Sequence, residues 1–269
     1  MNRVIKTLPL FFILAMLILA TGFFSLAQVE SKTYQNNTDL IRYINEQTSL
    51  LSSAILFVVE GVNKDYDSIA HVQQDLLKLI QQLTVDMPEV ITLKLSVVNL
   101  NNQVEHIKSV HAIYRNSALF FPTASRQLHQ RLKINNQANE LIMQLHTLER
   151  NLLLFHLSPD SFDRPVLEQD IQLIKNNSVI VSLNTETRLH LDLWLKHVQI
   201  IINHRLKLDR LLTNLLKSPI AEQSHIILAL YDADYQYKLA RAETMRKGFY
   251  ISAFLLIISV ILVLKFPNY

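Results

Sequence analysis

Two charged side chains interrupt an apolar stripe in the C-terminal third of the chain. Arg205 and Asp209 are four residues apart, so they face each other on one side of a predicted helix. The apolar residues on the same side are Val198, Ile202, Leu212 and Leu216. One interpretation is an internal ion pair that fixes the register of the helix. The other is that Arg205 receives an anionic ligand inside a helical bundle, and the sequence leaves both open.

Three histidines on the same predicted helix raise the question of a metal site. His190, His197 and His204 recur at intervals of seven residues. Seven residues span about 10.5 Å of helix, which is too far for two of these side chains to share one ion. The chain has no cysteine, and no HExxH motif occurs. We therefore expect no metal and no cofactor, and we interpret these histidines as residues at the edge of a helix core.

Catalytic groups have little support in the sequence. Asp232 and Asp234 are a poor carboxylate pair, because residues two apart do not share a helical face. No spacing places a nucleophile, a base and an orienting group together. The only three glycines, Gly22, Gly61 and Gly248, are too scattered to form a phosphate loop or a dinucleotide fingerprint. We predict that the chain is not an enzyme.

The formal net charge of +3 comes from the two ends of the chain. Arg3, Lys6 and Lys265 account for the whole excess of basic over acidic residues. The region between them is neutral and has no basic run of the kind that nucleic-acid-binding proteins use. We expect no nucleic-acid partner and attribute the end charges to membrane topology.

Two uncharged segments predict membrane spans around a large exported region. Residues 7–27 are 21 uncharged residues, and residues 249–264 are 16, extended to 249–266 if Lys265 reaches the interface. A cleaved signal peptide is the alternative for the first segment, although its apolar stretch is longer than usual. A buried core helix is the alternative for the second, but its apolar residues surround the helix. The basic residues place both termini in the cytoplasm and residues 28–248 outside.

The sequence of the predicted exported region indicates helices that are separated at prolines. Apolar residues recur every three to four positions, and scarce glycine argues against a fold rich in tight turns. We predict helices at about 32–62, 66–84, 88–119, 123–156, 162–176, 185–217 and 219–247. About 190 helical residues folded four abreast give a rod of roughly 70 Å. The fold class is therefore all-α, as an elongated double helical bundle of two stacked four-helix-type bundles.

Several segments resemble one family of bacterial sensors. Gly61–Asp67 (GVNKDYD) joins the first two predicted helices. Lys108–Pro122 (KSVHAIYRNSALFFP) has an Arg-Asn-Ser core with a proline five residues after the serine. The pattern near His197, the run at 211–219 and Arg246 also match. Together they resemble double all-helical ligand-binding (DAHL) sensor domains over residues 30–265.

The resemblance implies two stacked helical bundles in the periplasm, anchored in the bacterial inner membrane. Such a domain implies binding of a small ligand, a homodimeric assembly, and signalling to a histidine kinase or similar output. The sequence departs from the family at Val59-Glu60, where the family implies an arginine before the glycine. We expect the cytoplasmic output of the family to be missing after the second predicted span, which leaves a truncated, a split and a stand-alone sensor open.

The motif residues suggest a binding corner. Tyr66 and Asp67 begin a helix, where free amide groups and the positive end of the helix dipole lie. Arg115, Asn116 and Ser117 lie near the end of another predicted helix and offer several hydrogen-bonding groups. We expect these five residues, with Arg205, to bind the ligand. The alternative is that they only cap and pair helix ends.

A signalling role has a rival from another class of protein. We expect a membrane-anchored sensor that resembles the input part of a two-component sensor kinase. A non-sensing, membrane-tethered helical scaffold that docks another protein fits the same helices. A response to small molecules would distinguish the two, because only the sensor requires one.

Overall fold

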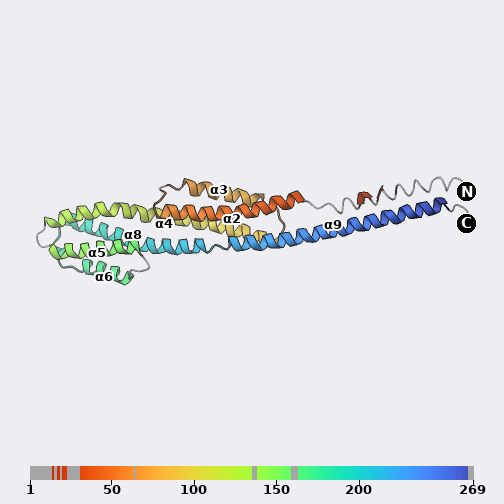
Figure 1. The fold of residues 1–269 in the computed structure, drawn as a ribbon. Helices are drawn as coiled ribbons and strands as arrows, with labels where there is room; N and C mark the ends of the chain where they lie inside the picture. Colours follow the sequence, from red (N-terminus) through yellow and green to blue (C-terminus); the bar gives the residue numbers. More distant parts are fainter. Residues whose placement is uncertain are drawn as a thin grey trace. The chain divides into compact units, whose positions relative to one another are not determined.

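The structure is a computed structural model that describes residues 14, 17–18, 20–22, 31–63, 65–134, 138–158 and 163–265. Helices account for most of this part of the chain, and no strand occurs in it (Figure 1). The fold is therefore all-α, as predicted. The helices are α2 Ser31–Val59, α3 Asp67–Gln82, α4 Pro88–Lys133, α5 Asn139–Leu157, α6 Arg164–Lys175, α7 Val179–Ser182, α8 Thr185–Leu216 and α9 Ile220–Lys265.

The break predicted near Pro122 is wrong. α4 continues through this proline to Lys133, and α5 begins at Asn139. An interior proline removes one backbone hydrogen bond and costs about 3 kcal/mol. Residues on both sides of Pro122, Tyr114 before it and Leu128 after it, are buried in one hydrophobic core. Burial of these side chains offsets the cost, because each large apolar side chain contributes about 1.5–3 kcal/mol.

The chain divides into two compact units. The first unit comprises residues 1–46, 78–94 and 220–269, and the second comprises residues 47–77 and 95–219. The two stacked four-helix-type bundles stay a prediction. The second unit holds the sequence motifs around Tyr66 and Arg115, and it includes the whole of α5, α6, α7 and α8.

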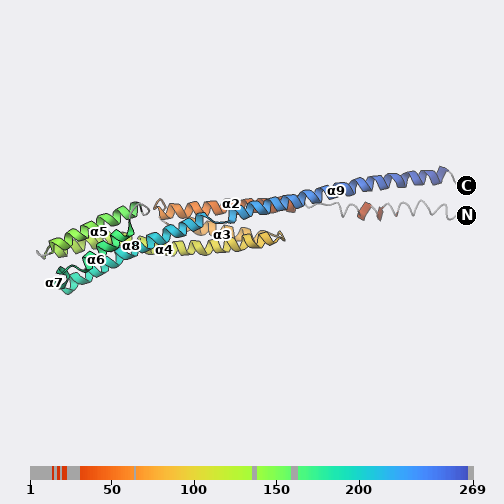
Figure 2. The same ribbon diagram turned by 90° about the horizontal axis from the view of Figure 1, so that it is seen from below.

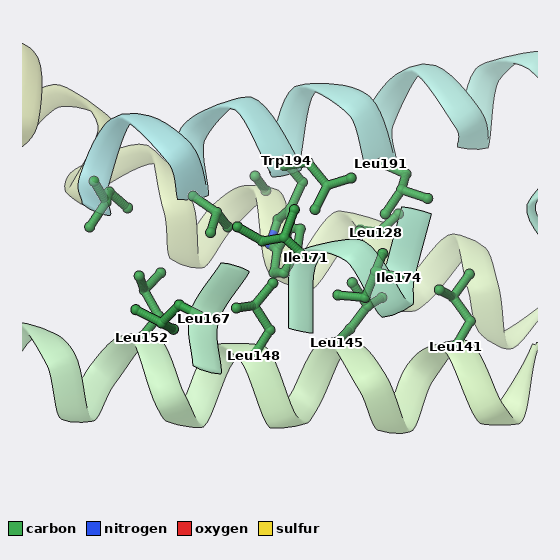
Figure 3. Close-up of a cluster of buried hydrophobic side chains, with 14 of the residues drawn as sticks. Leu128, Leu141, Leu145, Leu148, Leu152, Leu167, Ile171, Ile174, Leu191 and Trp194 are labelled. Atoms are coloured by element: carbon green, nitrogen blue, oxygen red, sulfur yellow. The ribbon is translucent and has the colours of Figure 1, made fainter. Parts of the chain in front are cut away.

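The second unit is built around a continuous hydrophobic core. In this unit α5 lies beside α6 and α8, as Figure 2 also shows. Four leucines at helical spacing on α5 point toward the other helices (Figure 3). They are Leu141, Leu145, Leu148 and Leu152. Trp194 of α8 is fully buried among them, and its indole N–H donates to Ser125 Oγ of α4 at 2.7 Å.

The first unit has a tyrosine stack beside its core. Tyr34 of α2 stacks on Tyr235 of α9, with ring centroids 3.9 Å apart. The hydroxyl of Tyr34 donates to Asp232 at 2.8 Å. Buried apolar residues of this unit include Ile41 and Ile44 of α2. Asp232, which the sequence offered as a poor catalytic carboxylate, therefore accepts a hydrogen bond that joins α2 to α9.

No helix in the described part of the chain is long and apolar enough to cross a membrane. The spans that we predict at residues 7–27 and 249–266 stay predictions. Most of the first segment lies outside the described residues, as does Phe266 of the second.

Candidate functional site

Polar and charged side chains gather in the second unit around the middle of α4. Two tyrosine–histidine pairs form the centre, with two arginines and two carboxylates close by. We call this group the tyrosine–histidine cluster; its members are Glu60, Tyr66, His111, Tyr114, Arg115, His156, Arg205 and Asp209. They come from α4, α5, α8 and the segment between α2 and α3.

A glycine turn places Tyr66. α2 ends at Val59, and Gly61 follows with φ of 75°, a backbone conformation that favours glycine. The amides of Val62 and Asn63 then donate to the carbonyl oxygen of Phe57, which closes the end of α2. This turn sends the chain back toward α3 and brings Tyr66 against α4. The Gly61–Asp67 motif therefore has a structural role that the sequence indicated.

The first pair joins Tyr66 to His111. The Tyr66 hydroxyl oxygen lies 2.7 Å from His111 Nδ1, and the tautomer decides which group donates. His111 is only 4% exposed. Burial, followed by the charges of Arg115 and Arg205, lowers the pKa of His111. Burial raises the pKa of Tyr66, so the pair is neutral at neutral pH.

The second pair joins Tyr114 to His156. The Tyr114 hydroxyl is hydrogen-bonded to His156 Nδ1, which links α4 to the end of α5. Burial raises the pKa of Tyr114. Burial also lowers the pKa of His156, and the charge of Arg205 adds to this effect. Tyr114 and His156 are therefore both neutral at neutral pH.

Arginines from two helices approach these pairs. Arg115 of α4 acts electrostatically on both Tyr66 and His111. Arg205 of α8 acts on His111 and also hydrogen-bonds to Tyr114. The positive charges of both guanidinium groups therefore act on His111. Because both histidines near them are neutral, the guanidinium groups are the main positive charges of the cluster.

Two carboxylates balance this positive charge. Asp209 Oδ1 lies 3.4 Å from Arg205 Nε, and the two side chains are 32% and 14% exposed. The predicted pairing of these two residues is therefore confirmed. Glu60 acts electrostatically on Tyr114 and His156. The cluster can thus offer positive groups to an anion and carboxylates to a cation within one site.

The structure brings together some of the residues predicted from the sequence. Tyr66, Arg115 and Arg205 belong to the cluster. Asp67 and Asn116 are exposed to solvent. Asp67 begins α3, where its own N–H donates to Asp65 Oδ1 at 3.2 Å. Ser117 is buried, at 4% exposure.

Other members of the cluster were missed in the sequence. His111 lies four residues before Arg115, and this helical spacing is a signal that could have found it. Tyr114 follows apolar residues at helical spacing, which hides it in the sequence, although a tyrosine hydroxyl needs a partner when buried. His156 lies 42 residues from Tyr114 and has no signal of its own in the sequence.

Two of the three histidines on α8 have separate contacts. His204 Nδ1 lies 3.0 Å from the Ile200 carbonyl oxygen of its own helix. The ring of His197 packs against Phe120 with centroids 4.5 Å apart. A different group, His129, His146 and Glu149, has potential metal-ligand atoms that all lie within 4.8 Å of one another.

Comparison with known proteins gives one match. The family model for the DAHL domain matches residues 29–246. No curated protein and no solved structure gives a significant match. The match includes the glycine turn, the Arg-Asn-Ser segment and all the members of the tyrosine–histidine cluster. With its two all-helical units and this match over most of its length, the chain belongs to the DAHL domain family.

Proposed function

We propose that the chain is a membrane-anchored periplasmic sensor module that binds a small ligand at the tyrosine–histidine cluster. The observation that carries the proposal is that the charges of Arg115 and Arg205, on two different helices, both act on the buried His111. Membership of a family of helical sensor domains supports a binding role rather than a catalytic one. A structural core alone has little use for buried polar groups such as His111 and Tyr114, because each must be desolvated.

The balance of charge suggests the chemistry of the ligand. Guanidinium groups bind carboxylates with paired hydrogen bonds. Glu60 and Asp209 would attract a positive group on the same molecule. Glu60 stands where the family resemblance implies an arginine, so the site is less positive than that pattern implies. We therefore propose a small zwitterion that carries both a carboxylate and an ammonium group.

Signalling follows if the ligand distinguishes two arrangements of the helices. A ligand that contacts Arg115 on α4 and Arg205 on α8 holds these two helices in one packing arrangement. Only a difference in affinity between two arrangements shifts their populations. A difference of about 1.4 kcal/mol changes the ratio tenfold.

The membrane part of the proposal comes from the sequence. Uncharged segments at 7–27 and 249–264, with basic residues beside them, support an inner-membrane module with both termini in the cytoplasm. We propose that a homodimer passes the signal to a separate histidine kinase or another output protein.

Ligand binding is tested by thermal unfolding of the purified full chain. The probes are the standard amino acids and glycine betaine, with acetate and methylamine as single-charge controls. We expect a zwitterion to raise the melting temperature and neither single-charge probe to match it. Arg115→Ala should abolish the shift, and Arg126→Ala, an exposed arginine on the same helix, should keep it.

Two results would contradict this proposal. If no probe stabilises the protein and a protein partner co-purifies with it, the helical scaffold is the better description. If a probe stabilises the protein equally in Arg115→Ala, the ligand binds elsewhere.

Topology is tested with single cysteines, because the chain has none of its own. Met143 is exposed on α5, so Met143→Cys should react with a membrane-impermeant maleimide in intact spheroplasts. Arg3→Cys should react only after the membrane is permeabilised. The reverse pattern would overturn the proposed orientation.

A further inference from the structure

His129, His146 and Glu149 form a separate polar group in the second unit, between α4 and α5. His129 lies near the end of α4, while His146 and Glu149 lie one turn apart on α5. His129 Nε2 is 2.9 Å from Glu149 Oε1, and His146 Nδ1 is 3.3 Å from Glu149 Oε2. The two imidazole rings stack, with centroids 4.3 Å apart. Two histidines and a carboxylate thus converge from two helices.

These distances match the donor set of a tetrahedral metal ion. Zinc binds histidine nitrogen and carboxylate oxygen at about 2.0–2.2 Å, which puts neighbouring ligand atoms about 3.3 Å apart. The potential ligand atoms of the three side chains all lie within 4.8 Å of one another. Small side-chain rotations would therefore close the three donors around one ion. Three protein donors leave one position for water.

The surroundings combine a fixed carboxylate with an open entrance. Glu149 and His129 are largely buried, whereas the side chain of His146 is 62% exposed. Ser125 hydrogen-bonds to Glu149 and also receives the indole N–H of the buried Trp194 at 2.7 Å. Such outer contacts orient metal-binding carboxylates. An ion can therefore enter past His146 and meet a carboxylate that the core already holds.

We propose that His129, His146 and Glu149 bind one divalent transition-metal ion, with Zn²⁺ as the best fit to this donor set. The bound ion clips the end of α4 to α5 next to the hydrophobic core. The two groups share no residue, so a variant at one group leaves the side chains of the other unchanged. The sequence predicted no metal because spacing along one helix reveals only donors on that helix, whereas these donors come from two helices.

One feature sets the expected affinity. Nδ1 of His129 is buried and has no hydrogen-bond partner in the described part of the chain. A metal-binding histidine usually donates its second N–H to an acceptor, and loss of that contact weakens binding about 10–100-fold. We therefore expect a site of moderate affinity that strips readily with a chelator.

The test is metal titration of the purified full chain, carrying a tag without histidines, after treatment with a chelator. We expect one Zn²⁺ per chain and a higher melting temperature with zinc. Co²⁺ at the same site should give the intense visible absorption of a four-coordinate ion. Absence of a stoichiometric zinc ion would overturn the proposal.

Matched variants assign the ion to these residues. His146→Asn and Glu149→Gln should each weaken zinc binding at least about 100-fold, more than the loss of an outer contact. His71→Asn should bind zinc like the native chain, because the exposed His71 pairs with Asp75 on α3, away from the three donors. Undiminished binding in His146→Asn would overturn the site. His146 is exposed, so its variant remains decisive even if Glu149→Gln does not fold.

Discussion

The hydroxyl oxygen of Tyr66 lies 2.7 Å from Nδ1 of His111, which ties the segment ahead of α3 to the middle of α4. The contact depends on the glycine turn after α2 and on the burial of His111 inside the second unit. It also joins two sequence motifs that lie far apart along the chain. This hydrogen bond gives the family motifs a physical link, and it can be tested directly.

Removal of the Tyr66 hydroxyl should destabilise the second unit. Tyr66→Phe leaves one nitrogen of the buried His111 without its partner, which costs about 1–3 kcal/mol. Chemical denaturation followed by circular dichroism measures the change. Tyr43→Phe, on the largely exposed Tyr43 of α2, should change the free energy of unfolding by less than about 0.5 kcal/mol. Equal effects in the two variants would show that the Tyr66–His111 bond contributes little.

Stability should fall as the pH drops below the ordinary histidine pKa of 6.5. Burial, then Arg115 and Arg205, lower the pKa of His111 in the folded protein, while Tyr66 is its hydrogen-bond partner. Below pH 6.5 the unfolded chain therefore binds more protons than the folded chain, and stability decreases with decreasing pH. Above this pH the contribution is constant.

Melting temperatures at about pH 7.5 and about pH 5.5 measure this effect, because that range brackets the ordinary histidine pKa. His111→Gln should show a smaller decrease between the two values than the native chain. An unchanged decrease in the variant would assign the pH dependence to other histidines, such as His156 and His197, whose pKa values burial also lowers.

Variants of the Arg205–Asp209 pair should distinguish a structural role of Arg205 from a role in ligand binding. Asp209→Asn alone leaves the mostly buried Arg205 without this counter-charge and should cost about 1–3 kcal/mol of stability. The double variant Arg205→Met with Asp209→Leu should recover most of that stability, because apolar residues can replace a buried ion pair. The same double variant should lose the thermal shift given by a zwitterionic ligand. A double variant that keeps the full shift would exclude Arg205 from the binding site.

Two glycines provide a matched test of backbone strain. A Cβ at either Gly61 or Gly248 would meet no atom within 4 Å, so neither position is limited by space. Gly61→Ala should lower stability by about 1–2 kcal/mol, because φ is 75° there. Gly248→Ala lies inside α9 and should raise local helix stability by about 0.5–1 kcal/mol. Circular dichroism melts of the two variants give the comparison, and shifts of the same sign would contradict it.

Features within one helix were predictable from the sequence. The 3.6-residue period makes Arg205 and Asp209 neighbours wherever their helix forms. In the structure Arg205 Nε lies 3.4 Å from Asp209 Oδ1. Gly61 is one of only three glycines, and a glycine after an apolar helix marks a helix end. Pro122 is the counter-example. Proline normally ends a helix, but burial of the residues on both sides keeps α4 continuous.

Contacts between helices were decided by the tertiary structure. Tyr114 meets His156 from 42 residues away, and His129 meets Glu149 from 20 residues away. Helix periodicity by itself determined that the chain is all-α and which residues share a face. Periodicity did not determine these contacts between helices, because the rotation and register of two helices depend on how their buried side chains fit together. In the second unit that fit is set by residues such as Leu148 and Trp194, whose packing exists only in the folded core.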